Sequence, residues 1–94
     1  MRLLFVKAPD GKTRFAMAGG KKIAKAHLRN RGRRVLKESL RRLHPWMKEG
    51  WWFACMLNEQ GLRAKADEVY ADLGALLKRK GFMKDDWPGA IWYQ

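Results

Sequence analysis

The first apolar positions of the chain form two short runs separated by a turn sequence. Residues 2–7 (RLLFVK) and 13–18 (TRFAMA) are rich in apolar side chains, and residues 8–12 read APDGK. Proline pre-sets the first dihedral of a turn, aspartate caps it, and glycine accepts a positive φ. Two apolar runs joined in this way predict a β-hairpin over residues 1–20. The glycine pair at residues 19–20 would then act as a hinge.

A longer pattern with helical spacing follows over residues 21–43. Its apolar positions recur at steps of three and four, which places them on one face of a helix. They are Ala24, Leu28, Gly32, Leu36, Leu40 and Leu43. Gly32 either lets the helix pack closely against a neighbour or breaks it in two. Because the stripe keeps its phase across the glycine, we expect one long or kinked helix.

The remaining pattern predicts two more helices and a tail. Pro45 suits the first turn of a new helix, and residues 46–60 include a run that is apolar on every side, as in a central core helix. Gly61 would cap the C-terminus of that helix. Residues 62–80 carry the apolar stripe of a further helix, which Gly81 would close. Residues 82–94 then dock on the core. The expected fold is therefore α+β and mostly α, with a helical pair over residues 45–81.

Length and composition favour one domain over residues 1–94. No apolar run approaches the roughly 18 residues of a membrane span. The N-terminal apolar run is too short for a secretory signal. Cys55 is the only cysteine, so an internal disulfide is impossible, in keeping with a reducing compartment. We therefore expect a cytoplasmic protein without a membrane partner.

The net charge of +12 is confined to the first 42 residues. Residues 21–42 contribute +9, residues 1–20 contribute +3, and residues 43–94 sum to zero. A merely solvated helix would mix glutamate among its lysines, yet Glu38 is the only acid in this segment. We therefore predict that the helix binds a polyanion or an acidic partner. The candidate contacts are Lys21, Lys22, Lys25, Arg29, Arg31, Arg33, Arg34, Lys37, Arg41 and Arg42.

Two kinds of partner fit this charge. In the first, the cations bind the phosphate backbone of DNA or RNA with little reading of sequence. In the second, the arginines pair with carboxylates of an acidic protein complex, and an exposed tryptophan supplies the anchor. The candidate anchors are Trp46, Trp52, Trp87 and Trp92. The residues alone leave both partners open.

No motif for catalysis, a metal or a small-molecule substrate is found. Residues 11–13 (GKT) lack the second glycine of a phosphate-binding loop, because Val6 stands in its place. His27, His44 and Cys55 have no ligand spacing that a zinc site would use. A nucleophile, a base and an orienting group cannot be assembled. We therefore expect a binding protein that is not itself an enzyme and needs no cofactor.

In size and composition, the chain resembles small accessory proteins of phages and mobile elements. Such proteins are compact, basic, rich in tryptophan and free of enzyme motifs, as this chain is. The resemblance implies a modulator or inhibitor of a host nucleic-acid-processing complex, for example a recombination nuclease of the RecBCD type. It carries no individual residue assignment.

Overall fold

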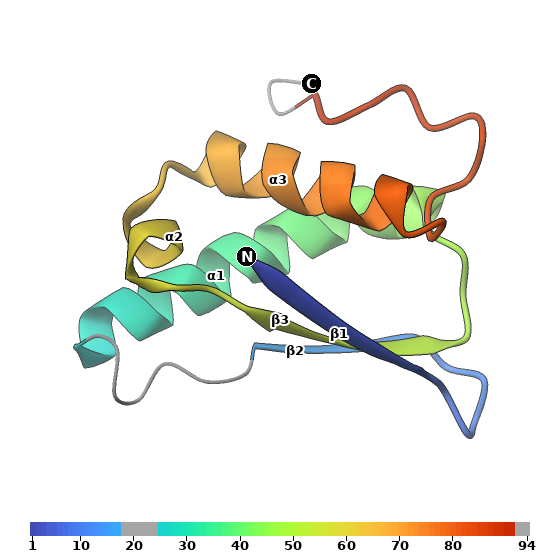
Figure 1. Ribbon diagram of the computed structural model, residues 1–94, viewed down its shortest axis with the longest axis horizontal. Coiled ribbons are helices and arrows are strands. Elements are labelled where there is room, and N and C mark those ends of the chain that lie inside the picture. The colour runs from blue at the N-terminus through green and yellow to red at the C-terminus, as the bar shows by residue number, and fades with distance from the viewer. Residues whose placement is uncertain (18–24, 92–94) are drawn as a thin grey trace.

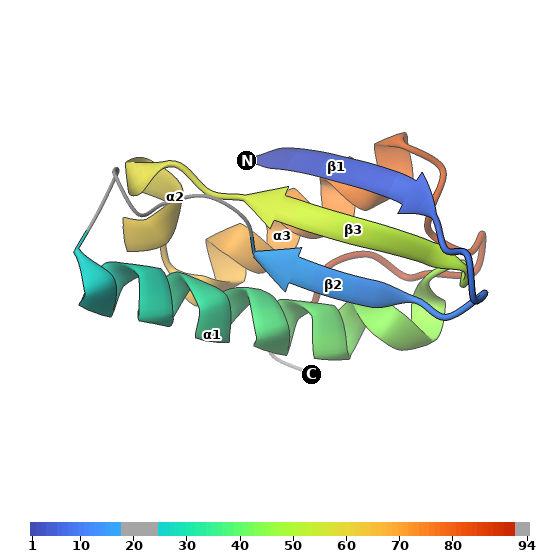
Figure 2. The same cartoon turned by 90° about the horizontal axis from the view of Figure 1, so that it is seen from below.

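The computed structural model describes residues 1–17 and 25–91 and shows an α+β fold, as expected (Figure 1). In chain order, its elements are β1 (Arg2–Lys7), β2 (Arg14–Met17), α1 (Ala26–Leu43), a 3-10 turn (His44–Trp46), β3 (Trp51–Met56), α2 (Glu59–Arg63) and α3 (Ala66–Arg79). Figure 2 shows the strands side by side, with α1 running along β2 and α3 behind the sheet. The predicted hinge at residues 19–20 lies outside the described residues.

The two N-terminal strands and the turn between them are present, but the predicted pairing is wrong. The strand order is β1-β3-β2, so β3 separates β1 from β2. β1 pairs with β3 antiparallel and β2 pairs with β3 parallel, and Phe5 and Phe15 both lie opposite Phe53. The turn reverses the chain without joining two neighbours, because β3 takes the central place and pairs with a strand on each side.

The prediction of a helix over residues 46–60 is also wrong, because the central part of this segment is the strand β3. A short apolar run cannot be assigned to helix or strand by periodicity alone, and its six residues are a typical strand length. Gly50, at φ +93°, ends the preceding turn, where its carbonyl accepts a hydrogen bond from Ala8 N–H at 2.8 Å. Asn58 then caps the next helix, and its side chain accepts a bond from Gly61 N–H at 2.7 Å.

Helix α1 confirms the predicted apolar stripe and passes through Gly32 without a break. Leu28, Gly32, Leu36 and Leu43 are buried together with Ser39. The Ser39 hydroxyl donates to the Val35 carbonyl at 2.8 Å, so it is satisfied within the helix. A β-carbon at position 32 would collide with the Leu62 side chain. Gly32 is therefore a point of close packing between α1 and α2.

The helix predicted over residues 62–80 divides into α2 and α3. The backbone is extended at Ala64 and Lys65, with ψ near 150°, which separates the two helices. Gly61 therefore lies inside α2 and is not the cap that the sequence suggested. Gly81 does close α3, at φ +84°, and Phe82 N–H returns to the Leu77 carbonyl at 2.9 Å.

The core lies between the inner face of the sheet and the helices. Phe53 stacks on Phe15 at 4.9 Å between ring centroids and meets Phe82 edge to face at the same separation. The C-terminal segment docks as predicted over its described part, residues 82–91: Trp87 covers Gly74 on α3, where an added β-carbon would lie 2.8 Å from the indole ring. The tail therefore closes the core on the side of α3.

Candidate nucleic-acid interface

The basic residues predicted to bind a partner lie mostly on the solvent side of α1. Five of them are exposed and three are half-buried in the described chain, while two precede it. The exposed five are Lys25, Arg33, Arg34, Lys37 and Arg41; the half-buried three are Arg29, Arg31 and Arg42; Lys21 and Lys22 lie outside the described residues. The apolar stripe on the opposite side holds this basic face outward.

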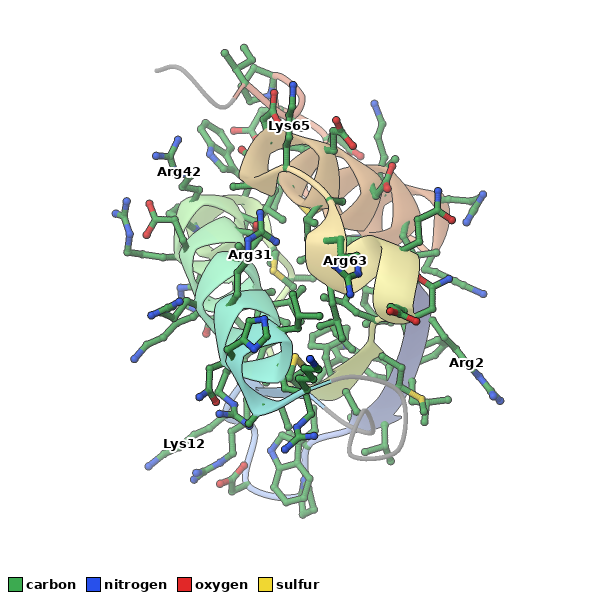
Figure 3. All side chains as sticks on the ribbon, turned by 90° about the vertical axis from the view of Figure 1, so that its left-hand side faces the viewer. Arg2, Lys12, Arg31, Arg42, Arg63 and Lys65 are labelled. Atoms are coloured by element: carbon green, nitrogen blue, oxygen red, sulfur yellow. The ribbon has the colours of Figure 1, made fainter. Side chains whose placement is uncertain are left out.

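The Arg31 guanidinium is used inside the protein, where it bonds the backbone of another element. It donates one hydrogen bond to the Leu62 carbonyl and a second to the Ala64 carbonyl, both at 2.7 Å. Figure 3 shows Arg31 between α1 and α2. Sequence reasoning placed Arg31 among the contacts, and nothing in the local pattern distinguishes it from its neighbours.

Glu38 partly neutralises the C-terminal end of the basic face. Its carboxylate accepts bonds from Arg41 at 2.6 and 2.9 Å and from Arg42 at 2.9 Å. Hydrogen bonds from these arginines lower the pKa of Glu38 from 4.5 to about 2. The basic residues without a neighbouring acid therefore lie before Glu38, in the turns formed by residues 25–37.

Over those turns, several cations have no protein partner. Within residues 1–17 and 25–91, the side chains of Lys25, Arg34 and Lys37 make no hydrogen bond or ion pair. Arg33 donates only to the Asn30 side chain, at 3.2 Å. Cations left without carboxylates on one surface attract an anionic partner and can bind it without first breaking protein contacts.

A groove joins this basic face to the sheet along the edge of β2. It has a volume of about 480 Å³, with an apolar floor and cations from α1 on its rim. Its lining residues are Phe15, Ala16, Met17, Arg33, Leu36, Lys37 and Leu40. Sequence reasoning missed this groove, because it did not place α1 beside the free edge of β2.

The outer face of the sheet is apolar and open. Leu4 and Val6 on β1 are 46% and 57% exposed, and with Trp52 and Ala54 they line a hollow of about 490 Å³ that is continuous with the groove at Phe15. Trp52 is half-buried there, and its indole N–H donates to the Lys12 carbonyl at 3.1 Å. Among the predicted anchors that lie within the described residues, it is the one that opens onto a surface hollow.

The other predicted anchors are placed differently. Trp46 is half-buried and packs against the core. Trp87 is buried against α3, so its ring does not lie on the surface as an anchor would. Trp92 lies outside the described residues.

Neither metal chemistry nor a reactive thiol stands out in the described chain. Among residues 1–17 and 25–91, no three His, Cys, Asp or Glu side chains gather closely enough to hold a metal ion. Burial raises the pKa of the Cys55 thiol to about 11, which keeps it protonated near neutral pH. No helix in this part of the chain is long and apolar enough to cross a membrane.

Comparison with known proteins identifies the family. Residues 1–81 match the Ribonuclease P family. The chain belongs to this family. A curated relative, the ribonuclease P protein component of Symbiobacterium thermophilum, is 34% identical over 76 residues, which cover 73% of this chain and 65% of the relative. The ribonuclease P protein of Thermotoga maritima has the same fold, with a TM-score of 0.72 and 26% identity over 82% of this chain and 74% of that one.

A second structure of the Thermotoga protein, in complex with 1-(4-fluorophenyl)-2-thiourea, matches with the same score and identity over 82% of this chain and 76% of that one. Membership of the Ribonuclease P family overturns the resemblance to phage accessory proteins, which rested on composition alone. A basic, tryptophan-rich composition is shared by many small nucleic-acid-binding proteins, and so it could not distinguish the two.

Proposed function

We propose that this protein is an RNA-binding protein component of ribonuclease P and that it binds RNase P RNA through the outward face of α1. The observation that supports this most is the row of cations at Lys25, Arg34 and Lys37, which have no partner within residues 1–17 and 25–91, in a chain that belongs to the Ribonuclease P family. The curated relative is named as a ribonuclease P protein component. RNA thus replaces the acidic host protein complex as partner, because the comparisons support only the former.

Contact with the phosphate backbone accounts for most of the binding in this proposal. The exposed or half-exposed cations of the described α1 face, without Arg31 and Arg42, are Lys25, Arg29, Arg33, Arg34, Lys37 and Arg41. Each phosphate that a cation neutralises releases condensed counterions. The slope of log K against log salt concentration becomes steeper by about 0.7–0.9 for each such contact. Six contacts correspond to a log–log slope of about −4 to −5.

The groove beside β2 suits a single-stranded part of the RNA. Unpaired bases stack on aromatic and apolar surfaces while cations hold the backbone. Phe15 and Met17 supply the apolar floor, and Arg33 and Lys37 stand on the rim. A strand that leaves the α1 face could therefore continue along β2 with its bases toward the sheet.

In this proposal the protein binds and positions RNA and does not catalyse the reaction. The side chains on the face and groove are ammonium and guanidinium groups with apolar neighbours. Such groups bind phosphate and stabilise its charge.

Salt titration of binding tests the proposal. A bacterial RNase P RNA and a DNA duplex of equal phosphate number are each titrated with the protein from about 50 to 300 mM salt. We expect tight binding of the RNA with a slope of about −4 or steeper. Lys37→Gln should make the slope shallower by about 0.7–0.9, whereas Lys78→Gln, at the end of α3, should leave it unchanged. Equal affinity for RNA and DNA, or a slope near zero, would count against the proposal.

A further inference from the structure

The Arg31 guanidinium on α1 bonds the backbone of another element through both of its terminal nitrogens. Leu62 belongs to the last turn of α2, where backbone carbonyls lack partners within the helix. The Arg31 Nη1 and Nη2 atoms reach the Leu62 and Ala64 carbonyls at 2.7 Å each. A guanidinium at this position satisfies those oxygens and complements the negative end of the helix dipole.

This contact matters because the first half of α1 has little other packing. Its buried positions are Leu28 and Gly32, and Gly32 contributes no side chain. The second half buries Leu36, Ser39 and Leu43 and also packs Val35 and Leu40 against the core. The absence of a β-carbon at Gly32 lets α1 approach α2 closely. The Arg31 bonds then supply the anchor that an apolar side chain supplies elsewhere.

We propose that Arg31 is a positioning residue for RNA binding: it fixes the first half of α1 on α2, and so preorganises the cations at Lys25, Arg29 and Arg34, instead of binding phosphate itself. This inference rests on the proposed function above. Because the first half of α1 is then ordered in the free protein, RNA binding does not incur the free-energy cost of ordering it.

The test uses substitutions that keep the charge. Arg31→Lys retains the positive charge. An ammonium group, however, lacks the planar fork through which the guanidinium donates two parallel hydrogen bonds. Arg79→Lys is the matched control, because Arg79 lies at the exposed end of α3, outside the proposed RNA-binding face, and makes no hydrogen bond or ion pair within the described residues. The full-length proteins are titrated with a bacterial RNase P RNA over a range of salt concentrations, and amide hydrogen exchange is measured on the free proteins.

We expect Arg31→Lys to weaken RNA binding about ten-fold, which corresponds to one charge-assisted hydrogen bond, with the salt slope unchanged. Amide protection over residues 28–34 should fall in the same variant. Arg79→Lys should alter neither quantity, whereas Arg34→Gln should make the slope shallower by about 0.7–0.9. Thermal unfolding measured in parallel ensures that every variant is folded at the titration temperature, so that general instability cannot account for lost affinity.

Two results would overturn the inference. One is an Arg31→Lys variant with the affinity and amide protection of the unaltered protein. The other is an Arg31→Gln variant whose salt slope becomes shallower as in Arg34→Gln while its protection stays intact, which would make Arg31 a direct phosphate ligand. If the unaltered protein fails to bind the RNA, the proposed function fails. Unchanged exchange in Arg31→Lys would independently refute the anchoring of α1.

Discussion

Replacing Phe53 by alanine should remove a large part of the stability of the fold. Phe53 lies in the middle of the central strand, is 3% exposed, and contacts Phe15 and Phe82 at 4.9 Å between ring centroids. Burial of an aromatic side chain removes about 150–250 Å² from water, worth roughly 4–6 kcal/mol at about 25 cal/mol per Å². Measured truncations of buried phenylalanine cost about 3–5 kcal/mol. We therefore expect a loss of about 4 kcal/mol.

The assay is urea unfolding followed by far-UV circular dichroism. A chain of 94 residues has a stability of about 5–14 kcal/mol, so the loss should shift the midpoint strongly. Phe5→Ala is the matched control, because Phe5 is 44% exposed at the sheet edge and should lose only about half as much. A loss below about 2 kcal/mol for Phe53→Ala, or equal losses for the two variants, would refute the placement of Phe53 at the centre of the core.

Three further predictions concern the tail, the thiol and the acid on the basic face. Gly74→Ala should destabilise the fold by about 1–3 kcal/mol in the same urea assay, because the new methyl group would displace Trp87. Cys55, with its pKa raised to about 11, should react with a thiol reagent at pH 8 only as fast as the protein opens, and rapid labelling in native buffer would contradict its burial. Glu38→Gln should tighten RNA binding several-fold in the salt titration, because one negative charge leaves the basic face. The folded-state pKa of Glu38 lies below 4.5, so its stabilising contribution is present above that pH and is lost as the pH falls toward 2, and the variant's stability should lack this pH dependence.

The elements with a strong local signal could be predicted from the sequence. The apolar stripe over residues 24–43 has a helical period, and it placed both the buried and the basic side of α1 correctly within the described part. The turn at residues 8–12 was equally clear, because its residue types match the dihedral angles that a turn requires. Both signals depend only on neighbours within a few positions along the chain.

The elements that were missed depend on distant partners. Trp51–Met56 is a strand because β1 and β2 pair with it on either side. The residues of this run do not themselves indicate that pairing. The groove beside β2 exists because α1 lies along the free edge of that strand, which no local pattern indicates. Arg31 likewise differs from Arg34 through two carbonyl groups more than 30 positions away. Long-range pairing therefore limited both the fold prediction and the site prediction.

The central place of β3 also bears on how the chain folds during synthesis. β1 and β2 each find their partner only in residues 51–56, so neither can join the sheet until more than half of the chain has left the ribosome. Contacts between distant residues and parallel pairing slow folding. Until then, the exposed apolar side chains of β1 and the crowded cations of α1 have no partner within the chain. A nascent protein of this kind is prone to aggregation, and early encounter with RNA would shield the cations while the sheet is completed.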